Sequence, residues 1–245
     1  MTARVGDGGI RVAAAADLHV ERGNVSAWRD ALEPLSDHSD VLLLAGDLTQ
    51  NGVADEANAL ADVLSVVSVP IFAVLGNHDL HMNASLELRR ILERQGVCVL
   101  EGEHAQLRVA GRSLGIAGST GFGGGFPGAE ASEFGEPEMK RFVCRARRMS
   151  ERLQGALEAL DSDVRIALLH YAPVPDTLVG ERLEIYPFLG SHYLGRAVDA
   201  AGADLVLHGH AHLGCEAGKT PGGVAVRNVA QPVIRAPYRV FPFAA

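Results

Sequence analysis

The sequence is poor in cysteine: it holds three in 245 residues, and they stand far apart at Cys98, Cys144 and Cys215. An odd, scattered set without a C-x-x-C pair provides no disulfide framework and favours a reducing compartment. Long apolar runs are also missing near the start of the chain, because the first run, residues 12–16, is too short for a signal-peptide core or a membrane span. We therefore expect a soluble cytoplasmic protein with no membrane partner.

An excess of positive charge is absent as well, because 30 acidic residues outnumber 22 lysines and arginines and give a net charge of -8. Phosphate backbones attract basic surfaces, so we expect no stable binding of nucleic acid. A small nucleotide remains compatible with this charge, because bound metal ions can supply positive charge locally. The content of 47% hydrophobic and 21% charged residues is that of a globular chain. We expect one domain over residues 1–245, and the sequence indicates no particular oligomeric state.

Short apolar runs alternate with stretches of helical spacing along the chain. Continuous runs suit strands buried on both faces, and they cover residues 12–16, 41–45, 71–75, 166–169 and 205–207. Strands with mixed patterning, expected in a second sheet, cover residues 107–109, 114–117 and 224–229. Helices are expected at residues 25–35, 55–66, 85–95, 138–160 and 191–201. This order predicts an α/β layer sandwich with functional groups at the carboxyl ends of its strands.

Each continuous apolar run is followed directly by polar residues of the kinds that bind metal ions. The clusters are Asp17-Leu18-His19, Gly46-Asp47, Gly76-Asn77-His78-Asp79, His170 and His208-Gly209-His210-Ala211-His212. Carboxylates and imidazoles at buried strand ends lose hydration unless they are paired or bound to metal. The candidate ligands are Asp17, His19, Asp47, Asn77, His170, His208 and His210. This set exceeds what one ion needs and predicts two, which a bridging carboxylate can hold about 3.5–4 Å apart.

In this order, the five clusters resemble the motifs of the calcineurin-like metallophosphoesterase family: D-x-H, G-D-x-x-x-x-G, G-N-H-D/E, a lone H and G-H-x-H. The resemblance spans residues 17–212. It implies a four-layer α/β/β/α sandwich, with two mixed β-sheets flanked by helices and the metal site at the carboxyl ends of strands. It further implies one metal held by Asp17, His19, Asp47 and His210, and another held by Asp47, Asn77, His170 and His208. His78 would reach the phosphate or the leaving oxygen, and Asp79 would orient His78.

For function, the resemblance implies hydrolysis of a phosphate ester by a water activated between two divalent metal ions. The mixed donor set favours Mn²⁺, with Fe and Zn²⁺ as alternatives. Family members of this size favour a small phosphodiester, such as a nucleotide, as the substrate, and a phosphomonoester is the alternative. Two competing hypotheses are a non-catalytic scaffold of the same fold and a metallohydrolase that cleaves an amide or a thioester.

For several features, the sequence is compatible with two interpretations. His212 either contacts the substrate or faces solvent. The glycine-rich stretch 118–126 either lines the cleft or is only a loop with positive φ angles, and it lacks the Lys-Ser/Thr ending of a P-loop. Residues 177–193, with Phe188, form either a substrate-selecting flap or a part of the core. The basic residues of 140–152 form either a solvated helix face or a surface for a phosphate-rich ligand or an acidic partner.

Overall fold

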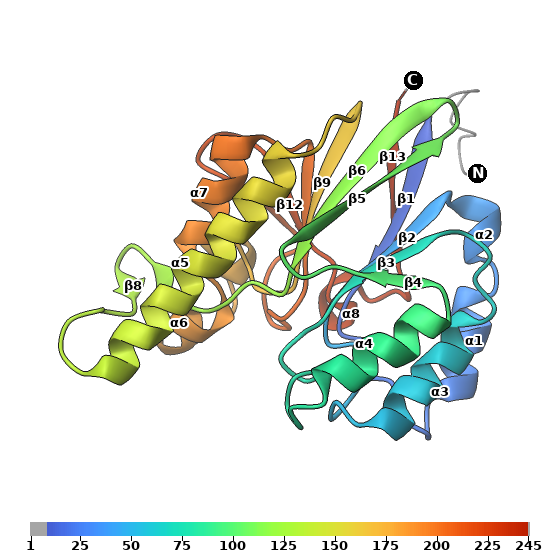
Figure 1. Ribbon diagram of the computed structural model, residues 1–245, viewed down its shortest axis with the longest axis horizontal. Helices are drawn as coiled ribbons and strands as arrows, with labels where there is room; N and C mark the ends of the chain where they lie inside the picture. Colours follow the sequence, from blue (N-terminus) through green and yellow to red (C-terminus); the bar gives the residue numbers. More distant parts are fainter. Residues whose placement is uncertain (1–8, 245) are drawn as a thin grey trace.

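Two large mixed β-sheets pack face to face (Figure 1) in the computed structural model, which describes residues 9–244. The end residues of the predicted domain, 1–8 and 245, lie outside this range. The first sheet has the order β13 (Arg239–Phe243), β1 (Ile10–Ala15), β2 (Val41–Ala45), β3 (Ile71–Val74) and β4 (Val97–Val99). The second has the order β11 (Ala217–Lys219), β12 (Ala225–Asn228), β10 (Leu205–His208), β9 (Val164–Leu169), β6 (Arg112–Ser119) and β5 (Glu103–Val109). A separate small hairpin joins β7 (Gly125–Phe126) and β8 (Ala129–Glu130).

Helices cover the outer face of each sheet (Figure 1). Those beside the first sheet are α1 (Val25–Leu32), α2 (Leu35–His38), α3 (Ala54–Leu64) and α4 (Ser85–Arg94). Those beside the second are α5 (Pro137–Glu158) and α7 (His192–Ala201). The shorter elements are the 3₁₀ turns η1 (Pro175–Leu178) and η2 (Leu183–Ile185), and the helices α6 (Tyr186–Leu189) and α8 (Gln231–Ile234). The predicted four-layer α/β/β/α sandwich is confirmed.

The continuous apolar runs arise because these strands are buried on both faces. In β1, Val12 and Ala14 point into the core between the two sheets, whereas Ala13 and Ala15 pack under the helices of the first sheet. Successive side chains of a strand point to opposite faces, so a strand covered on both sides needs an apolar residue at every position. The same alternation recurs in β2 and β9.

The parallel strands bring their carboxyl ends to one end of the sandwich. Strands β1 to β4 are mutually parallel, as are β6, β9, β10 and β12, while the edge strands β13, β5 and β11 run antiparallel. The polar clusters follow β1, β2, β3, β9 and β10, so all five lie at this end. Within residues 9–244, no helix has the length and apolar character needed to cross a membrane.

One predicted helix is wrong in its extent. The pattern predicted a helix over residues 25–35, but α1 ends at Leu32 and α2 begins at Leu35. Pro34 lies between them, and proline has no N–H to donate and clashes with the preceding helical turn. The other four predicted helices are present, with ends shifted by one or two residues.

Candidate metal centre

The loops that follow the parallel strands are tied together and locally strained. The Asp17 amide donates to the Gly46 carbonyl oxygen at 2.9 Å, which joins the loops after β1 and β2. Seven described residues other than glycine have a positive φ, and four of them lie in these loops: Asp17, His19, Asp47 and His210. Such backbone conformations cost about 1–3 kcal/mol each and cluster at functional sites. The strain therefore marks this end of the sandwich as the candidate site.

Asp47 lies at the middle of the site, and its side chain is only 2% exposed. Its Oδ1 accepts a hydrogen bond from the His78 amide at 2.8 Å. Gly76 makes room for this carboxylate, because a Cβ at that position would come within 2.1 Å of Asp47 Oδ1. Burial opposes ionisation of Asp47, but the charge and hydrogen bond of His170 outweigh burial and hold its pKa well below the usual range. Asp47 is therefore a carboxylate near neutral pH.

His170 is fully buried and turns one ring nitrogen toward two oxygen atoms. Its Nδ1 lies 2.9 Å from the Ala45 carbonyl oxygen, so Nδ1 carries a hydrogen and donates it. Its Nε2 lies 2.9 Å from Asn77 Oδ1 and 3.3 Å from Asp47 Oδ1. A neutral ring would present a lone pair to both oxygens, so this arrangement fits a cation between them, either a proton or a metal ion. Burial disfavours the proton, yet the Asp47 charge outweighs burial and raises the pKa of His170 to about 9.

His210 completes this first group of donors. Asp47, His170 and His210 each offer a ligand atom within 4.8 Å of the others. The Nε2 of His210 lies 3.1 Å from the Phe188 carbonyl oxygen, which orients the ring from its outer side. Burial and the neighbouring His170 lower the pKa of His210 to about 4, so its ring stays neutral near pH 7. A neutral imidazole is the form that binds a metal ion.

A second group of donors lies beside the first. Asp17, His19 and His212 have ligand atoms within 4.8 Å of one another, and so do His19, Asp47 and His78. His212 Nε2 lies 2.8 Å from Asp17 Oδ1, and this hydrogen bond raises the pKa of His212. His19 Nδ1 is buried and has no hydrogen-bond partner. In residues 9–244, only two other buried side-chain nitrogen or oxygen atoms lack a partner. Buried polar atoms are normally paired, so this nitrogen fits a bound cation.

The histidines of the final cluster lie differently from the arrangement that the predicted ligand roles would need. His208, expected as a ligand, is the last residue of β10 and is fully buried. Its Nδ1 pairs with the Gly209 carbonyl oxygen at 2.8 Å and its Nε2 with the Thr177 hydroxyl at 2.9 Å, so it joins none of the ligand groups. His210, expected beside Asp17, instead joins Asp47 and His170. His212, which was not predicted as a ligand, takes the place beside Asp17.

Asp79 does not contact the His78 ring that it was predicted to orient. The His78 ring is oriented by the Gln50 carbonyl oxygen, 2.7 Å from Nδ1, and not by Asp79. Asp79 is fully buried, and its two oxygens accept four hydrogen bonds of 2.6–3.1 Å, from the Leu48, Thr49 and Gly76 amides and the Thr49 hydroxyl. Its side chain therefore fastens the loop after β3 to the loop after β2. Burial and the charge of Asp47 raise its pKa despite these donors.

Replacing Asp79 with asparagine should lower the free energy of unfolding by about 2 kcal/mol, because the amide group leaves at least one buried N–H without an acceptor. Urea denaturation of both proteins measures the difference. The matched control is Asp30→Asn on an exposed helix position, which should unfold like the unaltered protein. A loss of hydrolysis by Asp79→Asn with unchanged stability would instead favour the predicted role in orienting His78.

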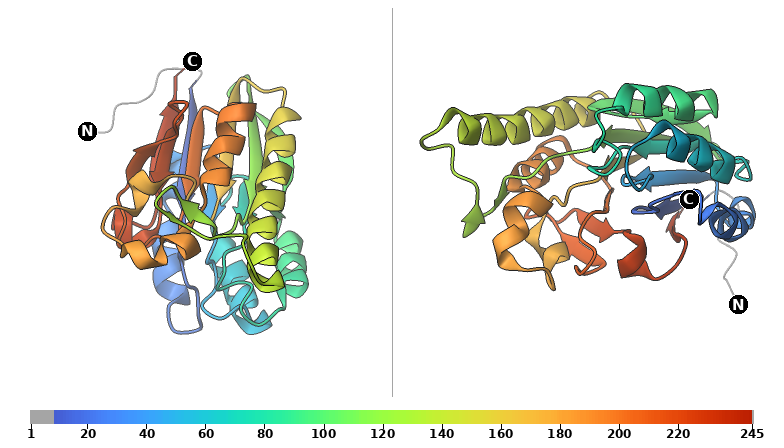
Figure 2. Two further views of the ribbon diagram at one scale, coloured as in Figure 1. Left: turned by 90° about the vertical axis from the view of Figure 1, so that its left-hand side faces the viewer. Right: turned by 90° about the horizontal axis from the view of Figure 1, so that it is seen from below.

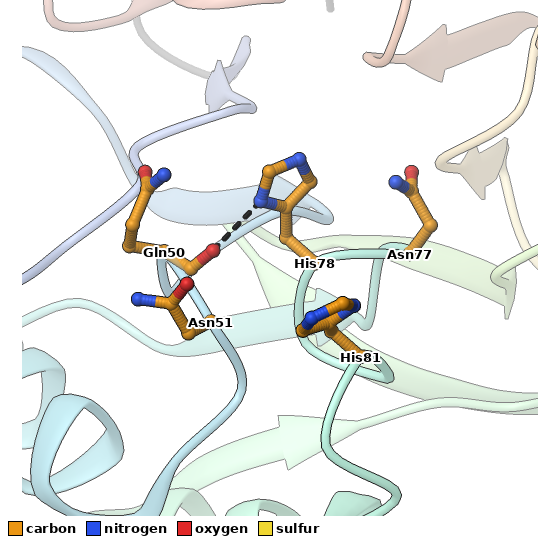
Figure 3. Close-up of a pocket in the computed structure, with 5 residues that line it drawn as sticks. All are labelled: Gln50, Asn51, Asn77, His78 and His81. Atoms are coloured by element: carbon orange, nitrogen blue, oxygen red, sulfur yellow. Dashed lines mark hydrogen bonds between the residues drawn. The ribbon is translucent and has the colours of Figure 1, made fainter.

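A cleft of about 240 Å³ opens beside the donor groups (Figure 3). Its walls are two loops of the first sheet, and the lining residues are Gln50, Asn51, Asn77, His78 and His81. Because Nδ1 of His78 donates to Gln50, its Nε2 is left free, and it lies 4.0 Å from Asp47 Oδ2. The cleft therefore gives a small ligand access to a polar wall and to the free nitrogen of His78.

Comparison with known proteins identifies the family and the fold. A family model described as calcineurin-like phosphoesterase matches residues 10–214. No curated protein sequence matches the chain significantly. Among solved structures, a phosphopantetheinyl hydrolase (PptH) from Mycobacterium tuberculosis is 16% identical, with a TM-score of 0.68 over 96% of each chain. The Thermus thermophilus sulfate thiohydrolase SoxB is 15% identical, with a TM-score of 0.53 over 94% of this chain and 53% of its own.

These two structures share the fold with this chain at low sequence identity. The family match is more specific, because it covers most of the sequence and contains all five polar clusters. It confirms the resemblance drawn from their order. The chain therefore belongs to the calcineurin-like phosphoesterase family.

Proposed function

We propose that the chain hydrolyses a small phosphodiester with the help of two divalent metal ions. The observation that carries the proposal is the placement of Asp47 between the two donor groups, with His170 Nε2 and Asn77 Oδ1 on one side and His19 on the other. One ion fits Asp47, Asn77, His170 and His210, and the other fits Asp17, His19, Asp47 and His212. Mn²⁺ suits this mixture of imidazole, carboxylate and amide donors, as Fe and Zn²⁺ do.

The bound ions would lower the pKa of water and neutralise charge on the phosphoryl oxygens. The protein residues supply the positioning. Asp47 accepts from the His78 amide and so fixes the loop that carries Asn77 and His78. The Ala45 carbonyl fixes the tautomer of His170, and the Phe188 carbonyl fixes the ring of His210. His78 turns its free Nε2 toward the centre, where it can donate a proton to the leaving oxygen or contact the phosphate.

A diester is favoured over a monoester by the charge of the described cleft. Its lining residues are amides and imidazoles, with no lysine or arginine among them. A phosphomonoester carries close to two negative charges at neutral pH, whereas a diester carries one. Apart from the proposed metal ions, this cleft offers no permanent cation to compensate the second negative charge of a monoester, which favours the diester.

The test compares bis(p-nitrophenyl) phosphate with p-nitrophenyl phosphate as substrates of the purified protein. With Mn²⁺ present, we expect kcat/KM for the diester to exceed that for the monoester at least about tenfold, equivalent to about 1.4 kcal/mol. Chelation followed by dialysis should abolish both activities, and added Mn²⁺ should restore them. Faster turnover of the monoester would assign a phosphatase. An absence of metal-dependent turnover on any phosphate ester would refute the proposal in favour of a scaffold.

The proposed ligand set makes a second prediction, which contrasts two histidines of one cluster. His212→Ala should weaken the binding of one Mn²⁺ by more than the roughly 10–100-fold that loss of an outer partner of a ligand costs, because a donor beside Asp17 and His19 is itself lost. His208→Gln should leave the number of bound ions at two, because His208 bonds only to Gly209 and Thr177. Isothermal titration with Mn²⁺ measures both. Loss of an ion from the His208 variant alone would restore the ligand set expected from the sequence.

A further inference from the structure

A chain of aromatic rings leaves the metal centre on the side of the second sheet and returns to it. The His210 ring lies 4.5 Å from the Tyr171 ring, and Tyr171 lies 6.0 Å from Phe122. Phe122 lies 4.9 Å from Phe142, and Phe142 lies 6.2 Å from Phe188. The circuit closes because the Phe188 carbonyl oxygen pairs with Nε2 of His210. These rings come from the loop after β9, the glycine-rich stretch, α5 and α6.

The ring of Phe188 is the exposed end of this circuit. Its residue is 59% exposed, whereas Tyr171, Phe122 and Phe142 are half-buried. The N-terminal half of α5, which supplies Phe142, projects beyond the two sheets (Figure 2). Phe142 meets Phe188 in a T-shaped contact with an interplanar angle of 75°, and Phe188 stays largely exposed beside it. Phe188 therefore presents an exposed aromatic ring, and the carbonyl oxygen of the same residue pairs with His210, a proposed metal ligand.

The glycine-rich stretch holds this surface in place. A Cβ at Gly123 would come within 2.3 Å of the Pro187 carbonyl oxygen and 3.3 Å of the Phe188 Cα, so only glycine permits the approach. The Gly124 amide donates to the same Pro187 carbonyl oxygen at 2.7 Å. Residues 118–126 do not line the described cleft, and Gly121, Gly124 and Gly125 have a positive φ, so the stretch fits the second interpretation, a loop with positive φ angles, and it packs against Pro187 and Phe188.

We propose that Phe188 is a stacking platform for the nucleobase of a nucleotide substrate, an inference that rests on the phosphoesterase function proposed above. The phosphoryl group would lie at the donor groups, and the base would stack on the exposed ring of Phe188. Stacking on an aromatic face accepts any base, because every base has a π-face. Phe188 would thus select for a base-bearing ester without distinguishing one base from another.

A planar ring fits this surface better than an alkyl chain does. The circuit is built of π-faces, and the guanidinium of Arg145 already lies over the Phe122 ring, 4.4 Å from its centroid. Arginine and aromatic faces at a groove are the elements that bind bases in single-stranded nucleic acids. An alkyl chain would gain only contact area from the same surface.

Phe188→Ala tests the contribution of the ring separately from that of the backbone carbonyl. The substitution removes the phenyl group but keeps the carbonyl oxygen that pairs with His210, so the metal centre keeps its orienting contact. Phe188→Trp retains a stacking surface. The matched control is Phe134→Ala, which removes an 89% exposed ring that lies outside the circuit.

The test measures the binding of AMP, ribose 5-phosphate and hexyl phosphate to the Mn²⁺-loaded protein by isothermal titration calorimetry. We expect AMP to bind about tenfold more tightly than ribose 5-phosphate to the unaltered protein, the low end of the range for one stacked base. Phe188→Ala should remove this preference, while Phe188→Trp and Phe134→Ala should keep it. Equal affinity of the unaltered protein for AMP and ribose 5-phosphate would overturn the inference.

Two further outcomes also overturn it. Equal weakening of AMP and ribose 5-phosphate by Phe188→Ala would show a structural role, and equal weakening of AMP and hexyl phosphate would show a merely apolar contact. Failure of the proposed function is seen separately, in the ester assay of the unaltered protein. A protein that prefers AMP but hydrolyses no ester would retain the platform and lose the catalytic proposal.

Discussion

Replacing Asp47 with asparagine should reduce metal-dependent hydrolysis of bis(p-nitrophenyl) phosphate about 10³-fold or more. Among residues 9–244, Asp47 is the one carboxylate that faces both donor groups, beside His19 and His78 on one side and His170 and His210 on the other. Loss of its charge would remove the proposed shared ligand and leave His170 Nε2 without the carboxylate beside it. A loss of about 4 kcal/mol of transition-state stabilisation, within the several kcal/mol that metal centres supply, corresponds to this factor.

The measurement pairs kcat/KM with the Mn²⁺ content after dialysis. We expect the Asp47 variant to hold fewer than two ions, while Asp161→Asn, a change of an exposed aspartate, keeps both the metal and the rate. Asparagine is close in size to aspartate and can still accept from the His78 amide, so the loop after β3 should keep its conformation. A variant that retains two ions and turns over within about tenfold of the unaltered rate would rule out a shared carboxylate.

The strands and the end of the sandwich that holds the site could be predicted because burial on both faces leaves a direct record in the sequence. The run at residues 41–45 is β2 itself, and Asp47 follows it after one glycine. By contrast, β13 leaves no such record. It is an edge strand with mixed burial, and it contains Pro242, which an edge tolerates because only one side of the strand needs its hydrogen bonds.

The roles within the final cluster could not be derived from spacing alone. Three histidines alternate at positions 208, 210 and 212, and a period of two places all of them on one side of an extended chain. The strand ends at His208, however, and His210 has a φ of 73°. The chain leaves the sheet at this point, which separates His208 from His210 and turns His212 toward Asp17. The signal that was available is the family pattern G-H-x-H, which begins at Gly209 and therefore points to His210 and His212.

Asp79 shows that two residues adjacent in sequence need not have side chains in contact. Adjacency to His78 suggested that the carboxylate orients the imidazole, but the chain turns at this point, with the Leu80 amide donating to the Gly76 carbonyl at 3.2 Å. The turn sends Asp79 into the buried space under the loop after β2 while His78 stays at the cleft. A backbone carbonyl, that of Gln50, then orients His78, and a backbone group leaves no residue-type signal in a sequence.

Removing the imidazole of His78 should lower kcat by an amount that depends on the leaving group. His78 Nδ1–H donates to Gln50, so in the doubly protonated ring Nε2 is the atom that can give its proton to the leaving oxygen. A proton donor contributes about 10²–10⁴-fold when the leaving oxygen is basic, as in an alkyl ester. The p-nitrophenolate oxygen is stable without a proton, so we expect His78→Ala to slow its release only about tenfold. The KM values should change little in either case.

The experiment therefore compares methyl p-nitrophenyl phosphate with an ester whose two leaving groups are both alkyl, using the same metal-loaded proteins. His81→Ala is the matched control, because His81 lines the same cleft but belongs to none of the donor groups. A loss by His78→Ala that is larger for the alkyl ester identifies His78 as the donor to the leaving oxygen. An equal loss on both esters would place Nε2 on a phosphoryl oxygen instead, since that contact stabilises the transition state whatever group departs.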